Sequence, residues 1–254
     1  RPVVRFDGVD DVLEIPNAPS LQPMEGSWTV IVAARRTGRG QGDFPQIIGS
    51  RPWVAGLDKG WAVSLSETGL LTSHFADDAS GHDVPAVTSA TTLGDALEIW
   101  QIEENRPAGR TNFYKRADLD RSLATAMPAA PVDQSPPVHL GREMGGANNR
   151  RAQIDLAEVL VYNRVLSEVE RITATSYLAE RYGLSFTLNA APSVTLTSPT
   201  GAATVAAGDA LVIEATAADG DGSVQRVEFF DGGELVATAT QPPYRATVRP
   251  LTPG

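Results

Sequence analysis

Apolar residues recur at every second position through much of the chain, which is the spacing of side chains on one face of a β-strand. The strongest such segment is Ser27–Arg36 (SWTVIVAARR), where apolar side chains fall on both faces, so we predict a strand covered on both sides. Shorter alternating segments separated by turn residues predict further strands at Val3–Val9, Val12–Pro16, Gln46–Ser50, Gly60–Ser66, Leu70–Ala76, Leu97–Glu104, Arg110–Arg116 and Pro137–Arg142. The first two flank a turn at Asp10–Asp11 and are predicted to pair as a hairpin. This spacing predicts two antiparallel sheets packed face to face.

The period changes from two to 3.6 within Gln153–Leu184, QIDLAEVLVYNRVLSEVERITATSYLAERYGL. Its first part is continuously apolar and predicts a buried strand. Ser167 with Glu170 three residues later forms a capping box, and Gly183 stands where a helix ends in a left-handed residue. We therefore predict one helix that closes a sheet domain over residues 1–188.

After Leu188 the composition changes, and five short strands are predicted in residues 189–254. They are Val194–Thr197, Ala210–Ala217, Val224–Phe230, Leu235–Thr240 and Tyr244–Val248. An immunoglobulin-like sandwich has seven strands, so we expect this second domain to be a truncated one.

Composition narrows the class of protein. The chain has 254 residues, 42% of them hydrophobic, with 23 Gly and 18 Pro, which fits a turn-rich, mainly β protein. The net charge of −10 argues against nucleic acid or an anionic membrane as a partner. The absence of Cys excludes disulfides and thiolate metal sites.

Three stretches resemble the laminin-G-like branch of the concanavalin A-like lectin/glucanase jelly rolls: RFDGVDDVLEIP at Arg5–Pro16, SWTVIVAAR at Ser27–Arg35 and AEVLVYNRVLSEVERITATSYLAERYGL at Ala157–Leu184. VEFFDGGELVATATQPPY at Val227–Tyr244 resembles a bacterial Ig-like repeat. The resemblance implies an all-β fold, a two-sheet jelly-roll sandwich with one C-terminal helix followed by a partial Ig-like β-sandwich. It also implies a secreted or cell-surface bacterial protein with neighbouring domains, in which such modules bind glycans, hold a catalytic unit near its substrate, or act as spacers.

The segment Gln153–Glu158 (QIDLAE) is similar to the E-I-D-x-x-E strand motif of glucanases on this jelly roll, in which two glutamates act as nucleophile and acid. Gln153 stands at the nucleophile's position, and an amide cannot form a glycosyl-enzyme intermediate. Asp155 and Glu158, three apart on a strand, are expected to point to opposite faces. We therefore predict that the chain is not an enzyme.

Glycan binding requires an exposed aromatic face and planar polar groups. Trp28, Trp61 and Trp100 follow strand alternation and are expected in the core, whereas Trp53 lies in a Pro- and Gly-containing loop. Long loops at Asp77–Pro85, Asp118–Pro136 and Glu143–Arg151 are where binding residues tend to lie. The predicted ligand-binding residues are Trp53, His74, His82, His139, Arg142, Asn148, Asn149 and Arg150.

Acidic residues in the first of these loops, Asp77–Pro85, predict a cation site. Asp77, Asp78 and Asp83 offer oxygen ligands, which favour Ca²⁺ over Zn²⁺. Further calcium candidates are Asp7, Asp10, Asp11, Asp219 and Asp221, all of which also suit plain turns.

Taken together, the sequence predicts a non-catalytic module that binds a polysaccharide. The alternatives are an adhesion or structural spacer module without glycan binding and a glycoside-active enzyme.

Overall fold

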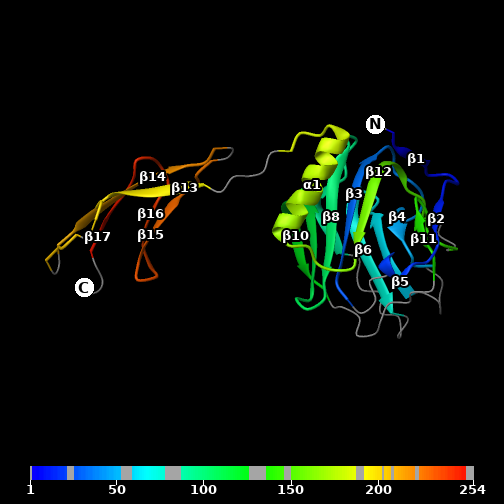
Figure 1. Cartoon of the computed structure of the whole chain (residues 1–254), viewed down its shortest axis with the longest axis horizontal. Helices are drawn as coiled ribbons and strands as arrows, with labels where there is room; N and C mark the ends of the chain where they lie inside the picture. Colours follow the sequence, from blue (N-terminus) through cyan, green and yellow to red (C-terminus); the bar gives the residue numbers. More distant parts are fainter. Residues whose placement is uncertain are drawn as a thin grey trace. The chain divides into compact units, whose positions relative to one another are not determined.

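The computed structural model (Figure 1) describes residues 2–21, 26–52, 59–77, 87–125, 136–145, 150–186, 192–201, 203–206, 209–220 and 223–249. The chain divides into two compact units, Arg1–Phe186 and Thr187–Gly254. Among the described residues, none of the helices has the length and apolar character needed to cross a bilayer.

Two six-stranded antiparallel sheets build the first unit. The first sheet has the order β1 (Val4–Asp7), β12 (Gln153–Tyr162), β3 (Trp28–Arg36), β8 (Glu98–Asn105), β9 (Arg110–Lys115) and β10 (Asp118–Ala124). The second sheet has the order β2 (Leu13–Ile15), β11 (Val138–Leu140), β4 (Gln46–Gly49), β5 (Lys59–Leu65), β6 (Leu70–Asp77) and β7 (Val87–Thr92). A short 3-10 helix, η1 (Pro19–Leu21), follows β2.

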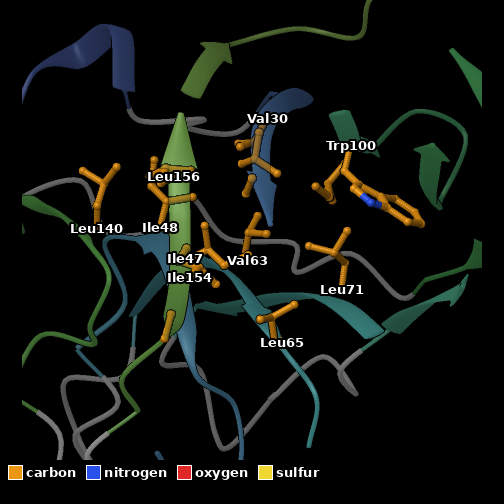
Figure 2. Packing of buried hydrophobic residues seen from close by; sticks show 14 of the residues in the cluster. Val30, Ile47, Ile48, Val63, Leu65, Leu71, Trp100, Leu140, Ile154 and Leu156 are labelled. Atoms are coloured by element: carbon orange, nitrogen blue, oxygen red, sulfur yellow. The ribbon is translucent and has the colours of Figure 1, made fainter. Parts of the chain in front are cut away.

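The apolar residues that alternate along the strands meet between the two sheets (Figure 2). Trp28, Trp61 and Trp100 are at most 1% exposed, which confirms their predicted place in the core. The rings of Trp28 and Trp61 lie 5.2 Å apart, so residues of opposite sheets pack directly on each other. Burial of these large aromatic groups supplies much of the stability of the sandwich.

Helix α1 (Glu168–Tyr182) covers the outer face of the first sheet. Its apolar side, with Ala174 and Leu178, packs on Ile31, Ala33 and Ile99. This explains why β3 is apolar on both faces, as predicted. The predicted caps are confirmed: Ser167 and Glu170 form the capping box, and Gly183 has φ 68°.

Two strand predictions are wrong. The segments of β1 and β2 do not form a hairpin, because β1 pairs with β12 in the first sheet and β2 with β11 in the second. The chain crosses between the sheets at Asp10–Asp11, and apolar alternation cannot show which sheet a strand joins.

The sequence also missed two edge strands. Strand β10 lies in a segment predicted as loop, and β7 was not predicted. Both edge strands are rich in polar residues, which weakens the apolar signal.

The second unit contains the five predicted strands. They are β13 (Ser193–Ser198), β14 (Leu211–Ala218), β15 (Val227–Asp231), β16 (Glu234–Ala239) and β17 (Tyr244–Val248). One sheet has the order β13-β14-β17 and the other is the hairpin β15-β16. Ile213, Val227, Phe229 and Tyr244 form its small core.

Candidate functional site

A row of side chains crosses the outer face of the second sheet. Strand pairing aligns Glu14 with His139, His139 with Gly49, Gly49 with Ala62, and Ala62 with His74. Their neighbours Leu140, Ile48, Val63 and Phe75 point into the core, so this row points outward. Three strand spacings separate the two histidines, which is about 14 Å. The predicted residues His74 and His139 therefore share one face, with Gly49 and Ala62 between them.

His139 and Glu14 form the edge of this row. The Nε2 atom of His139 lies 3.1 Å from Oε2 of Glu14, and the two side chains are 12% and 63% exposed. This pair is accessible to a ligand.

His74, by contrast, is only 2% exposed. Its Nε2 atom lies 3.0 Å from Oγ1 of Thr72, and its ring meets the ring of Phe44 edge-on. Burial, helped by the positive charges of Arg51 and Arg150, lowers the pKa of His74 to about 3. His74 is therefore a neutral, buried support of the face, and its ring has almost no surface to offer a glycan.

Arg150 is likewise a buried residue, and carboxylates already engage it. Its Nε and Nη2 atoms donate to Asp43 at 2.8 and 3.1 Å, and Nη1 donates to Glu143 at 3.1 Å. Burial alone would raise the pKa of Asp43, but the hydrogen bonds and charge of Arg150 lower it overall. Sequence reasoning missed Asp43 and Glu143, because their pairing with Arg150 joins segments far apart in the chain.

Arg142, directly after β11, is partly exposed. Its carbonyl accepts a hydrogen bond from Nε2 of Gln46 at 3.1 Å. Gln46 pairs with Ser64, and Ser64 with Thr72, in a second outward row of the same sheet. Within the described part of the chain, the guanidinium of Arg142 has no hydrogen bond or ion pair, so it keeps its donors for a ligand.

The other predicted site residues lie outside what the structure describes. This holds for Trp53, His82, Asn148 and Asn149 among the ligand-binding residues, and for Asp78, Asp83 and the side chain of Asp77 among the metal ligands. They remain predictions.

A different acidic group is brought together between β1 and β2. Asp7, Asp10 and Asp11 are exposed, and each offers a carboxylate oxygen within 4.8 Å of the others. Asp7 and Asp11 also accept hydrogen bonds from backbone N–H groups of this turn. The cluster therefore combines the oxygen-rich ligands that suit Ca²⁺ with ordinary turn chemistry.

The structure corrects one prediction about Gln153–Glu158. A β-bulge between Leu156 and Glu158 adds one residue to β12, so Asp155 and Glu158 point to the same outer face instead of opposite faces. Sequence alternation cannot show a bulge.

Both carboxylates are held by local partners. Asp155 has a fully buried side chain and receives hydrogen bonds from Arg5 and Arg35. Hydrogen bonds from Arg5, then Arg35, together with their charges, lower the pKa of Asp155 to about 2. Glu158 accepts from the hydroxyls of Tyr177 and Tyr182, and Nε of Arg181 lies 2.8 Å away. These contacts tie both carboxylates into the packing of the first sheet.

Residues 192–254 match the family model of the bacterial Ig domain. No curated protein sequence matches the chain significantly. Solved structures do resemble it, starting with the binding domain of Paraclostridial Mosquitocidal Protein 1, at TM-score 0.55 and 17% identity over 69% of this chain and 43% of that chain. The K499G mutant of NanB sialidase from Streptococcus pneumoniae has TM-score 0.52 and 12% identity, over 84% of this chain and 33% of that chain.

A third structure, the CBM40 of Ruminococcus gnavus IT-sialidase bound to alpha2,3 sialyllactose, has TM-score 0.48 and 13% identity, over 65% of this chain and 97% of that chain. At these identities the likeness concerns the fold alone. The chain spans less than half of the mosquitocidal and NanB chains. The predicted all-β class, a jelly-roll-like sandwich with one helix followed by an Ig-like unit, is confirmed.

Proposed function

We propose that Arg1–Phe186 is a non-catalytic carbohydrate-binding module of a secreted or cell-surface bacterial protein, and that it binds a polysaccharide at the β2–β11 edge of the second sheet, where Glu14, His139 and Arg142 reach solvent. The observation that carries this proposal is the gathering of the predicted residues. His139 and Arg142 come from the segment of β11, Arg150 from the segment before β12 and His74 from β6, yet all four lie on or beside one face. The outer face of the first sheet is covered by α1.

The described residues at this face have two roles. His74 and Arg150 are buried and hold the scaffold, while His139, Glu14 and Arg142 are accessible. A free guanidinium fits the carboxylate or sulfate groups of an acidic polysaccharide, and imidazole and carboxylate groups bond sugar hydroxyls. Trp53 and Asn148–Asn149 would add the aromatic face and planar amides that sugar binding uses.

The carboxylates of the glucanase-like segment support a non-catalytic role. A retaining glycosidase places two carboxyl groups ~5 to 5.5 Å apart across an open scissile bond. Here Asp155 is enclosed by two arginines and Glu158 by two tyrosines and Arg181, on the sheet face that α1 covers. Gln153 supplies an amide where the motif has its nucleophile.

Affinity gel electrophoresis with acidic and neutral polysaccharides tests this function. We expect the wild type to be retarded by at least one acidic polysaccharide. Arg142→Ala removes an unpaired guanidinium, so it should weaken binding about 10-fold or more. Arg110→Ala, which removes an exposed arginine bonded to Ser122 on the first sheet, is the matched control and should bind as wild type. Normal migration on every polysaccharide would favour the spacer function instead.

We further propose that the module binds Ca²⁺, with Asp7, Asp10 and Asp11 as the described ligands. At 10 mM Ca²⁺ and a dissociation constant of about 1 mM, linkage predicts a gain of about 1.4 kcal/mol in unfolding free energy. Thermal melts with Ca²⁺ and with chelator should therefore differ by a few degrees. Asp10→Asn should abolish the difference. If it persists in that variant, the ion occupies another site.

A further inference from the structure

We propose that a small cavity at the C-terminal end of α1 binds the carboxylate group of an organic anion. The cavity has a volume of about 70 Å³ and lies between the start of β8, the turn from β9 to β10, and the residues that follow α1. Leu97, Ala179, Leu184 and Phe186 give it apolar side chains, polar groups share its surface about equally, and Arg116 is the one cation among its lining residues.

Arg116 has an unusual backbone. It opens the two-residue turn between Lys115 and Asp118, and its φ of 60° is the one positive value among the described residues other than glycine. Side chains with a Cβ atom rarely adopt this conformation, and such turn positions favour glycine. An arginine is held here against local preference, which is characteristic of functional positions.

Neighbouring groups fix this backbone in place. The N–H of Arg116 donates to the carbonyl of Ile99 at 2.7 Å, and its own carbonyl accepts from Nε2 of Gln101 at 2.7 Å. Gln101 is fully buried, and its Nε2 also lies 2.8 Å from Oγ1 of Thr175 on α1. The turn is therefore tied to both the sheet and the helix, and the cavity wall is pre-organised.

The guanidinium of Arg116 is exposed, and no hydrogen bond or ion pair engages it within the described residues. The one carboxylate among the lining residues, Glu98, is already bonded to Nζ of Lys115 at 2.8 Å and to Nε1 of Trp100 at 3.1 Å. Two of the last four helix carbonyls also have partners, because the N–H groups of Gly183 and Leu184 donate to the carbonyls of Glu180 and Ala179. Within the described residues, a cation without a partner thus lies beside a cavity lined by both apolar and polar groups.

These features select the class of ligand. A guanidinium binds a carboxylate through two parallel hydrogen bonds, and the apolar side chains of Leu97, Leu184 and Phe186 can contact a short hydrocarbon body attached to it. The volume restricts the buried part to the carboxylate and a few carbon atoms. The site belongs to the first sheet and is independent of the proposed glycan face, so either proposal can fail alone.

Two-dimensional NMR titration of the full chain with propionate tests the site, with propionamide as the neutral analogue of the same shape. We expect saturable shifts of the Ile99 and Leu184 amide signals with a dissociation constant of about 1 to 10 mM for propionate. Propionamide should bind at least about 10-fold more weakly, since it lacks the charge.

Arg116→Gly gives the sharpest variant, because it removes the guanidinium and relieves the backbone strain at once. Propionate binding should be lost while the melting temperature rises by about 2 to 4 °C. Arg110→Ala, on the same sheet and away from the cavity, should bind propionate as wild type does. The proposal is overturned if propionate produces no saturable shift, if propionamide binds equally well, or if Arg116→Gly retains binding.

Discussion

Glu104→Gln is expected to stabilise the first unit by about 3 to 5 kcal/mol at pH 9 and to change its stability little at pH 4.5. Glu104 is fully buried on β8, between the two sheets. Ser73 of the second sheet donates to Oε1 at 2.5 Å, and Thr111 of the first sheet donates to Oε2 at 2.7 Å. Burial raises the pKa of Glu104 to about 8, although these hydrogen bonds and the charge of Arg106 partly oppose the shift.

The direction of this pH dependence follows from the linkage between protonation of Glu104 and folding. Between about pH 4.5 and pH 8 the folded state keeps the proton of Glu104, whereas the unfolded chain has released it, so unfolding becomes more favourable as the pH rises. Taken alone, the ionisation of Glu104 costs up to ~1.4 kcal/mol of unfolding free energy for each pH unit in this window. Glutamine has the same shape and remains neutral, so it keeps the hydrogen bonds to both sheets and removes this loss.

Urea unfolding followed by tryptophan fluorescence measures the effect. All four tryptophans precede residue 187, so the signal reports the first unit alone. Glu98→Gln is the matched control, because Glu98 lies on the same strand and pairs with Lys115 near the surface. It should give no stabilisation at pH 9. Equal pH profiles for wild type and Glu104→Gln would show that the Glu104 carboxyl ionises normally in the fold.

Much of the fold was predictable because apolar alternation is a local signal. The buried strand at Trp28–Arg36 and the helix with caps at Ser167 and Gly183 could be placed from spacing and end residues alone. The edge strands β7 and β10 could not, because edge positions tolerate polar residues and dilute the pattern. The crossing from β1 to β2 and the bulge in β12 depend on pairing between distant segments.

The candidate site was predictable only in part for the same reason. Residue types suited to sugar binding can be recognised in the sequence, but burial decides which of them face a ligand. Arg142 and Arg150 look alike in sequence, yet Asp43 and Glu143 engage Arg150 while Arg142 keeps its donors. Arg116 carried no sequence signal, since only a backbone angle of 60° sets it apart.

His74→Gln is expected to remove a loss of stability in acid that Glu104 offsets in the wild type. Burial lowers the pKa of His74 to about 3, so the unfolded chain takes up a proton below pH 6.5 that the folded state refuses. Between pH 6.5 and pH 5 this proton uptake by the unfolded chain lowers the unfolding free energy of the wild type by about 2 kcal/mol. Over the same range the contribution of Glu104 changes by nearly the same amount with opposite sign. Between about pH 4.5 and pH 6.5 the unfolding free energy of the wild type should therefore be nearly constant.

The two variants should separate these contributions. Glu104→Gln should become less stable as the pH falls through this window, and His74→Gln should become less stable as the pH rises. If His74→Gln keeps the flat profile, the buried imidazole is not the group that opposes Glu104.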